Sequence, residues 1–480
     1  MIHIPLRSQA GLRVRTADMA RNLLRLFLSN GGRIAVQLLL LPVLARIVAP
    51  DAFGLMAMVM PVIVFATILA EAGLVTGLVR SDVDHNAEAS AFWFSTAVGL
   101  VAAALVAALA IPFARLSGQA RAAPLLLALA PCLVLAGATA VPSARLQRRG
   151  EFGAFARIEL IAAAGGALAA LGAALAGWNA FSLVVQQVVM AGLRLVGGVL
   201  ASGFKPRGHF RLAEVWRILS HSSPMLGANL LAYLSRSLDN LLIGLFVGPR
   251  SLGFYATAYQ VIQVPEYVLG ASARTIALPA IAQADGRLDA AAAYFASLRV
   301  VIAVAAPAAM GCCVVAEPLV RLLLGPTWGA AAPLIVILAP LGLAWSCFQL
   351  NIAVLAGLKD TRAQIRSSVL TSALGIIGIL AGLSSGVRGI AIGYAVGTAA
   401  SAIPNFAYVV RALGASPRQV VDAFVRPVAS GAVMALVVRW WMTSPGAPVS
   451  PLLQVGGAGA LGLATYVLAW IALDILTMDL

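Results

Sequence analysis

The sequence predicts an all-α membrane protein that crosses the bilayer about fourteen times. Of its 480 residues, 61% are hydrophobic and 11% are charged, whereas soluble domains carry about 25% charged residues. Apolar runs of about 20 residues, long enough to span the hydrocarbon of a bilayer, recur from one end of the chain to the other. The alternation typical of membrane β-strands is absent from these runs. The sequence therefore predicts a bundle of transmembrane helices.

The predicted spans group as six, six and two. A cytoplasmic N-terminal segment (1–21) precedes an N-terminal lobe (22–203), a basic connector (204–223) leads to a C-terminal lobe (224–411), and two further spans occupy 412–480. The spans of the N-terminal lobe lie near 22–48, 53–78, 89–113, 121–142, 155–177 and 179–203. The spans that follow lie near 224–247, 252–280, 296–319, 330–356, 364–384, 387–411, 420–441 and 451–475.

The formal net charge is +15, and the basic residues stand in short clusters between the apolar runs. With the N-terminus in the cytoplasm, about 23 Lys and Arg fall on the cytoplasmic side and about seven on the outer side, as the positive-inside rule requires. The charge therefore predicts orientation, and we expect no nucleic acid partner. The first 20 residues are basic and lack the apolar core of a signal peptide, so we expect no cleaved signal.

A turn sequence occurs twice, once after the first predicted span and once after the seventh. Residues 30–57 align without gaps to residues 229–256, and both contain the pattern V-x-P-x-x-[FL]-G. Proline fixes φ and glycine permits a tight reversal, so the pattern suits a hairpin turn. Each copy opens a block of six spans, and an even number returns the chain to the same side. The repeat therefore predicts two parallel lobes related by an axis along the membrane normal, an arrangement found in alternating-access transporters.

The sequence offers little for covalent chemistry. Walker A, Rossmann and HExxH patterns are absent. The four cysteines, Cys132, Cys312, Cys313 and Cys347, match neither a metal spacing nor a disulfide framework. No connection is long enough to fold as a soluble domain. We therefore expect no catalytic residues, no metal and no cofactor, and we interpret the chain as a transporter rather than an enzyme.

Polar residues interrupt the predicted first helix of each lobe. Once the basic residues on the cytoplasmic and outer sides have been counted, Arg33, Arg194 and Arg236 remain as the arginines inside predicted spans. Because Arg236 and Asp239 are three residues apart, they share one helix face. They form either a self-neutralising pair that joins helices or one wall of a polar cavity. The candidate binding residues of this cavity are Asn30, Arg33, Gln37, Asn229, Arg236 and Asn240. The planar fork of arginine suits phosphate, so such a cavity favours an anionic head group.

Three acids in predicted spans are candidates for coupling transport to an ion gradient. They are Asp239, Glu71 and Glu266. When the two repeats are overlaid, Glu71 and Glu266 fall about one helical turn apart. A protonatable carboxylate in a cavity can couple cation movement to a conformational change. The alternative for each acid is a neutral, hydrogen-bonded structural role.

Three stretches resemble a known family. They are "LLLLPVLARIVAPDAFGLMAM", "QRRGEF" and "RSLDNLLIGLFVGPRSLGFYATAYQV". They resemble the polysaccharide-type lipid-linked oligosaccharide flippases of the multidrug, oligosaccharidyl-lipid and polysaccharide exporter superfamily. The resemblance implies two six-helix lobes in a V around a cationic cavity, and transport of undecaprenyl-pyrophosphate-linked sugars from the cytoplasmic to the periplasmic leaflet. It also implies an Arg-x-x-Asp stretch that opens the second lobe, matched here by Arg236 and Asp239.

The sequence therefore favours a bacterial inner-membrane flippase for a lipid-linked anionic oligosaccharide, used in exopolysaccharide, capsule or O-antigen (lipopolysaccharide) assembly. Membrane lipid, a polysaccharide polymerase and export machinery are the expected partners. Three alternatives remain open at this point. They are a cation-coupled multidrug exporter of the same architecture, a peptidoglycan-precursor flippase, and an integral-membrane glycosyltransferase or polymerase. Arg33 and Arg236 argue against the first, and the short loops argue against the last.

Overall fold

The computed structural model describes most of the chain. The described residues are 32, 35–71, 74–80, 84–263, 281, 286–358, 360–445, 448 and 450–478; inside helices, the side chains of 76, 80, 221–229, 231–232, 234–236, 361 and 476–478 are not described. Every regular element in these ranges is a helix. The predicted all-α class is confirmed.

The chain divides into two compact units, unit 1 (Met1–Ser237) and unit 2 (Leu238–Leu480). Unit 1 contains a helix at Ala35–Ile47, followed by α2 (Pro50–Glu71), α3 (Leu74–Arg80), α4 (His85–Leu116), α5 (Ala122–Leu129), α6 (Pro131–Arg148), α7 (Phe152–Leu175), α8 (Ala180–Ser202) and the first part of α9 (Leu212–Phe246). Unit 2 contains the end of α9, a helix at 249–263, α11 (Arg287–Leu323), α12 (Ala331–Gly357), α13 (Thr361–Gly382), α14 (Gly386–Leu413), α15 (Pro417–Thr443) and α16 (Pro451–Met478). Short 3₁₀ turns lie at Pro326–Trp328 and Leu383–Ser385.

Ten stretches among the described residues are long and apolar enough to cross a membrane. One of them, Arg362–Leu413, comprises the two helices α13 and α14. The helices Ala35–Ile47 and Ser237–Phe246 are apolar but shorter. The polytopic membrane class is therefore confirmed, whereas the count of fourteen spans and the two-lobe repeat stay predictions.

Local sequence signals explain where several helices begin and end. Asp84 precedes α4, and its Oδ1 accepts a hydrogen bond from the backbone N of Ala87 at 2.8 Å. Ser416 and Gln419 form a capping box at the start of α15, with Pro417 at the first helical position. Such caps satisfy backbone N–H groups that have no partner within the helix. At the other end, Gly414 terminates α14 with φ of +67°, a conformation that costs glycine little.

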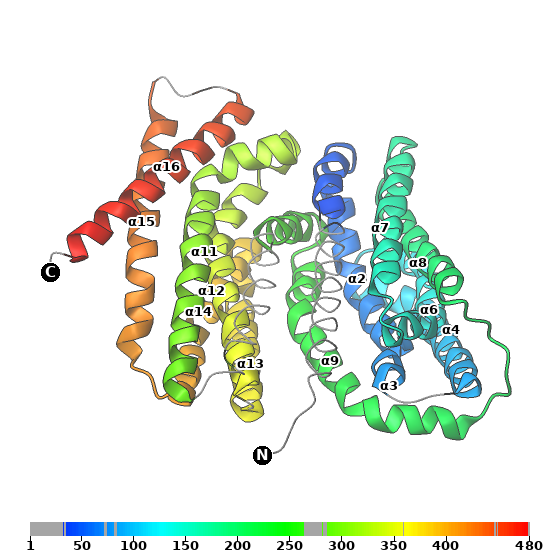
Figure 1. Ribbon diagram of the computed structural model, residues 1–480. Coiled ribbons are helices and arrows are strands. Elements are labelled where there is room, and N and C mark those ends of the chain that lie inside the picture. Colours follow the sequence, from blue (N-terminus) through cyan, green and yellow to red (C-terminus); the bar gives the residue numbers. More distant parts are fainter. Residues whose placement is uncertain are drawn as a thin grey trace, which may run out of the picture. The chain divides into compact units, whose positions relative to one another are not determined.

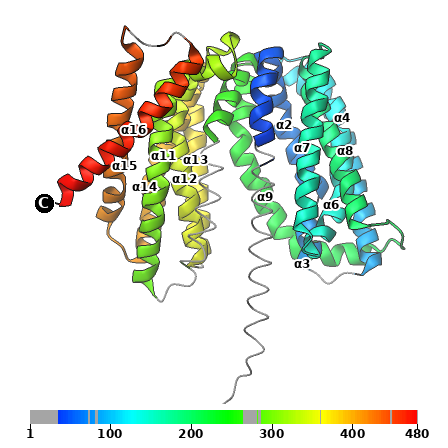
Figure 2. The ribbon, with the colours of Figure 1, turned by 45° about the horizontal axis from the view of Figure 1, so that its top comes forward.

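Small residues let neighbouring helices of unit 2 touch backbone to backbone. A Cβ added to Gly378 of α13 would lie 2.0 Å from the carbonyl oxygen of Gly393 in α14. One added to Gly382 would lie 2.0 Å from the oxygen of Gly389. Close approach through glycine is the usual route to tight helix pairs in lipid, where apolar burial gives little driving force. The helices α15 and α16 complete unit 2 beside α11 (Figure 2).

A buried polar network crosses four helices of unit 2. Tyr294 of α11 donates its hydroxyl to Oδ1 of Asn351 in α12 at 2.9 Å. Nδ2 of Asn351 donates to Oδ1 of Asn405 in α14 at 3.0 Å, and Nδ2 of Asn405 donates to Thr371 Oγ1 in α13 at 3.3 Å. Asn351 is 0% exposed, so these bonds replace all of its contacts with water. The network therefore fixes the register of the four helices.

The helices of unit 1 run up and down between two ends (Figure 1). One end carries the start of α4, the end of α6, the start of α7 and the end of α8. We call it the basic end, because Arg145, Arg148, Arg149 and Arg157 lie there. The opposite end carries the starts of α2, α5 and α8. Phe204 and Ile218, which follow α8, pack at the basic end against Leu74, Leu78 and Ala87, so the connector between the predicted lobes is anchored to unit 1.

Candidate functional site

The predicted candidate Asp239 is a buried carboxylate in the last part of α9. It is 5% exposed. Its Oδ2 accepts a hydrogen bond from the hydroxyl of Tyr255 at 3.1 Å, and its Oδ1 accepts one from the backbone N of Asn240 at 2.7 Å. Tyr255, in the next helix (249–263), is 0% exposed. The carboxylate is thus buried in unit 2, where these two groups donate to it.

A row of aromatic side chains continues from this carboxylate. The rings of Tyr255 and Tyr259 are 6.0 Å apart between centroids, and those of Tyr259 and Trp345 are 4.9 Å apart. Trp345 of α12 lies 6.3 Å from Tyr394 of α14. Aromatic faces attract cations, and hydroxyl groups both donate and accept hydrogen bonds. A carboxylate at one end of such a row can hold a proton or a cation while the row offers polar and stacking contacts.

The structure describes some of the other predicted site residues. Gln37 is exposed on the helix Ala35–Ile47, Asn240 is half-buried beside Asp239, and Glu71 is half-buried at the end of α2. Asn30, Arg33 and Glu266 lie outside the described residues, as do the side chains of Asn229 and Arg236. The Arg236–Asp239 pair therefore stays a prediction. What the structure adds is Tyr255, a partner of Asp239 that the shared-face argument missed; its signal was the pair Tyr255 and Tyr259 four residues apart.

Unit 1 holds an ion pair between two membrane-length helices. Nη2 of Arg194 in α8 lies 2.8 Å from Oε2 of Glu159 in α7. Both side chains are largely shielded from water, at 28% and 18% exposed. The sequence identified Arg194 only as an arginine inside a span, because nothing local indicates which acid of another helix it meets.

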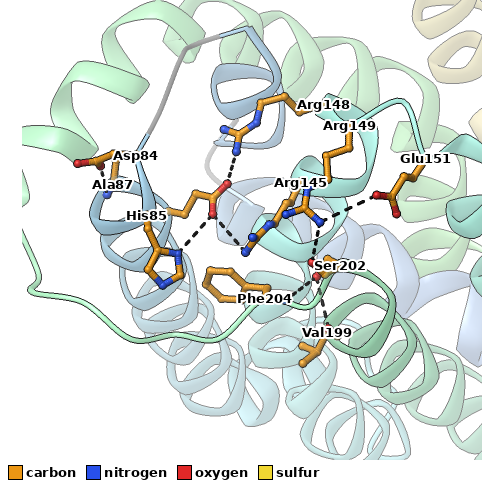
Figure 3. Close-up of polar contacts among 11 residues, drawn as sticks. Asp84, His85, Ala87, Arg145, Arg148, Arg149, Glu151, Val199, Ser202 and Phe204 are labelled. Atoms are coloured by element: carbon orange, nitrogen blue, oxygen red, sulfur yellow. Dashed lines mark hydrogen bonds and ion pairs between the residues drawn. The ribbon is translucent and has the colours of Figure 1, made fainter.

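At the basic end, Glu88 of α4 is the centre of a charged cluster, whose partners His85, Arg145 and Arg148 are labelled in Figure 3. Glu88 is 4% exposed and pairs with Arg148, with Arg145 at 3.5 Å and with His85 at 3.9 Å. Nearby, Nη1 of Arg149 donates to the carbonyl oxygen of Ser202 at 3.1 Å. The "QRRGEF" turn thus ties α4 and α6 to the end of α8. The sequence predicted these arginines as orientation signals and included Arg148 and Arg149 in the family resemblance, but it did not identify Glu88.

These features define a class: an all-helical integral membrane protein with charged groups held inside its bundle. The fold is also found in a lipid II flippase and in a multidrug transporter. A lipid II flippase in an inward closed conformation superposes with a TM-score of 0.77 at 13% identity, over 95% of this chain and 99% of that one. An inward-facing multidrug resistance transporter superposes with a TM-score of 0.58 at 15% identity, over 80% of this chain and 94% of that one.

The chain belongs to the polysaccharide biosynthesis protein family, which matches residues 43–333. It is 28% identical over 464 residues to the succinoglycan biosynthesis transport protein ExoT of Rhizobium meliloti, covering 94% of this chain and 92% of that protein. It is 24% identical to the lipopolysaccharide biosynthesis protein WzxC of Escherichia coli, covering 80% of each. The resemblance expected from the three sequence stretches is confirmed.

Proposed function

We propose that the protein is a flippase that moves a polyprenyl-pyrophosphate-linked oligosaccharide across the bacterial inner membrane. The observation that carries this proposal is the nearly full-length similarity to a transport protein of succinoglycan biosynthesis, on a fold shared with a lipid II flippase. A second relative, named for lipopolysaccharide biosynthesis, supports the same substrate class. The translocated oligosaccharide is used in exopolysaccharide, capsule or O-antigen assembly, in which a polysaccharide polymerase and export machinery are the proposed partners.

The proposed substrate site is formed by the polar residues that the sequence places in the first helix of each predicted lobe. Arg33 and Arg236 bind the pyrophosphate, because each guanidinium donates two parallel hydrogen bonds and keeps its charge at every physiological pH. Asn30, Gln37, Asn229 and Asn240 contribute neutral polar contacts. The polyprenyl tail stays in lipid, and the site alternates between the two sides of the membrane as the lobes rock.

Asp239 is the best supported of the three coupling candidates. Its two hydrogen bonds inside an apolar unit leave it able to accept a proton or a cation, and either change removes its charge or compensates for it. Glu71 and Glu266 are the other two. A cation that binds one of these acids more tightly in one of the two alternating-access conformations shifts the equilibrium toward that conformation.

The proposed orientation places the basic end of unit 1 and the N-terminus in the cytoplasm. The cluster of Arg145, Arg148 and Arg149 at that end supports it, because cytoplasmic loops carry an excess of Lys and Arg.

The test is complementation of a bacterial strain that lacks its own flippase for a lipid-linked surface glycan. The wild-type chain should restore surface glycan, and Arg33→Ala and Arg236→Ala should not, although both remain in the membrane. Arg388→Ala is the matched control, because Arg388 is exposed at the start of α14 and should leave export intact. Full export by both cavity variants would overturn the proposed head-group site.

A peptidoglycan-precursor flippase is the second candidate, and the TM-score of 0.77 to a lipid II flippase is the observation that favours it. The two candidates separate in a strain depleted of its lipid II flippase. Rescue of growth there, without restoration of a surface polysaccharide, would favour the second candidate.

A further inference from the structure

A cleft opens at the end of unit 1 opposite the basic end. It lies where α2, α5 and α8 begin, and its volume is about 280 Å³. The side chains that give it chemical character are Asp51, Arg121, Trp178, Asn179 and Phe181. The volume is close to the lower limit of small-molecule sites, about 300 Å³, so the cleft suits a ligand of one or two rings.

The cleft contains an exposed pair of opposite charges. Nη1 of Arg121 lies 3.4 Å from Oδ2 of Asp51, and the two side chains are 77% and 37% exposed. An exposed pair at this distance contributes little to folding stability. Its remaining donors and acceptors are available to a ligand, since a guanidinium has five N–H groups and a carboxylate has two acceptor oxygens. The pair is neutral as a whole, so it favours a ligand rich in hydroxyl groups over an anion.

Two aromatic side chains stand beside this pair. Trp178 is 58% exposed and Phe181 is 39% exposed. An aromatic face packs well against the C–H face of a pyranose ring, while the sugar hydroxyls point to the rim and reach polar groups. A membrane-interface anchor also uses exposed tryptophan. An anchor, however, needs no carboxylate, guanidinium and amide around the same cleft.

The backbone at the rim is strained. Asn179 has φ of +46° and ψ of −119°, a conformation that favours glycine. Its carbonyl oxygen accepts hydrogen bonds from Ser182 Oγ at 2.6 Å and from Ser182 N at 3.0 Å, which hold the peptide in place. Its side chain caps no helix N–H. Strain of this kind persists where the surroundings fix it, and it clusters at ligand sites.

From these observations we propose that the cleft is a sugar-binding subsite for one or two neutral pyranose units. Trp178 and Phe181 stack on the rings, and Asp51, Arg121 and Asn179 bind the hydroxyl groups. The inference rests on the proposed function, in which this end faces the outer side. The subsite then holds part of the oligosaccharide on the side to which it is delivered, at the opposite end of unit 1 from the cytoplasmic cluster.

The experiment measures binding of cellobiose and lactose to the purified full-length protein in lipid nanodiscs by ligand-observed NMR. Wild type should bind at least one disaccharide with a saturable dissociation constant. Trp178→Ala should raise that constant about three- to tenfold, as loss of one aromatic contact predicts. Asp51→Asn should weaken binding as well, and Trp178→Phe should retain most of it. Trp216→Ala is the matched control, because Trp216 is 65% exposed in α9 near the basic end.

Two results would overturn the subsite. In the first, wild type and Trp178→Ala have the same thermal stability and either bind the disaccharides with equal affinity or both fail to bind them. The other is stronger binding of glycerol phosphate than of either disaccharide, which would identify a lipid head-group site. The assay involves no transport, so a failure of the flippase proposal is recognised separately, by lost complementation with sugar binding intact.

Discussion

Asp239 and Tyr255 form a hydrogen bond of 3.1 Å between two buried side chains from consecutive helices of unit 2. Among the described residues, the tyrosine hydroxyl and the backbone N of Asn240 both donate to this carboxylate. In an apolar surrounding the ionised carboxylate depends on both. Tyr255 therefore contacts both Asp239 and the aromatic row of Tyr259, Trp345 and Tyr394.

Tyr255→Phe removes this donor and should alter ion dependence as well as stability. Leaving the buried carboxylate short of a partner costs about 1–3 kcal/mol in the free energy of unfolding. In the proposed coupling role of Asp239, export should respond differently to the proton or sodium gradient, because the carboxylate remains but has lost one donor. The measurements are thermal unfolding and glycan export with each gradient collapsed in turn. Tyr294→Phe is the control, because that hydroxyl belongs to the asparagine network and its loss should lower stability only. Unchanged gradient dependence in Tyr255→Phe would show that the hydrogen bond from Tyr255 to Asp239 plays no part in coupling.

Glu88→Gln should destabilise the basic end of unit 1. The substitution leaves Arg145 and Arg148 without their shared carboxylate, while both keep partial access to water at 17% and 29% exposed. We expect a loss of roughly 1–3 kcal/mol, less than for a fully buried pair. Thermal unfolding of the purified protein measures it. The control is Glu151→Gln, which removes an exposed carboxylate 4.0 Å from Arg149 and should change stability by less than about 0.5 kcal/mol. Equal stability of the two variants would show that Glu88 does not hold the cluster together.

The all-α membrane class was predictable because it depends on local quantities. The length and apolarity of a run decide whether a helix can span the bilayer, and neither depends on what the helix touches.

The partners of the charged residues were not predictable, because each partner comes from another helix. Arg236 is near Asp239 in sequence, so the shared helix face suggested that pair and gave no reason to select Tyr255. Glu88 and Arg148 meet only because α4 packs beside α6, and Arg194 meets Glu159 only because α8 packs beside α7. Composition determines that such charges must be compensated in a membrane, but only the packing determines by which residue.

Asn351→Leu should weaken the packing of α11, α12 and α14. Asn351 accepts from Tyr294 and donates to Asn405, and hydrogen bonds between membrane helices contribute about 0.6 kcal/mol each. Two lost bonds, together with two partners left unsatisfied, predict a loss of about 1–3 kcal/mol. Thermal unfolding of Asn351→Leu, Asn405→Leu and the double variant measures it. The effects should be strongly non-additive, because either change breaks the same bond. Ser297→Ala, which removes a bond within α11 alone, is the control; strictly additive losses would contradict a connected network.

Gly378→Ala should separate α13 from α14. The added Cβ would lie 2.0 Å from the carbonyl oxygen of Gly393, well inside van der Waals contact. That oxygen belongs to the backbone, so it cannot rotate away as the end of a side chain could. The two helices must move apart, which removes the neighbouring contacts of Gly382 with Gly389 as well. Overpacking of this kind costs about 1–3 kcal/mol or more. Gly456→Ala in α16 is the matched control, because no atom lies within 4 Å of its added Cβ and alanine favours a helix by up to about 1 kcal/mol. The temperature of thermal unfolding should therefore fall for Gly378→Ala and rise for Gly456→Ala. A Gly378→Ala protein as stable as wild type would contradict the close backbone contact.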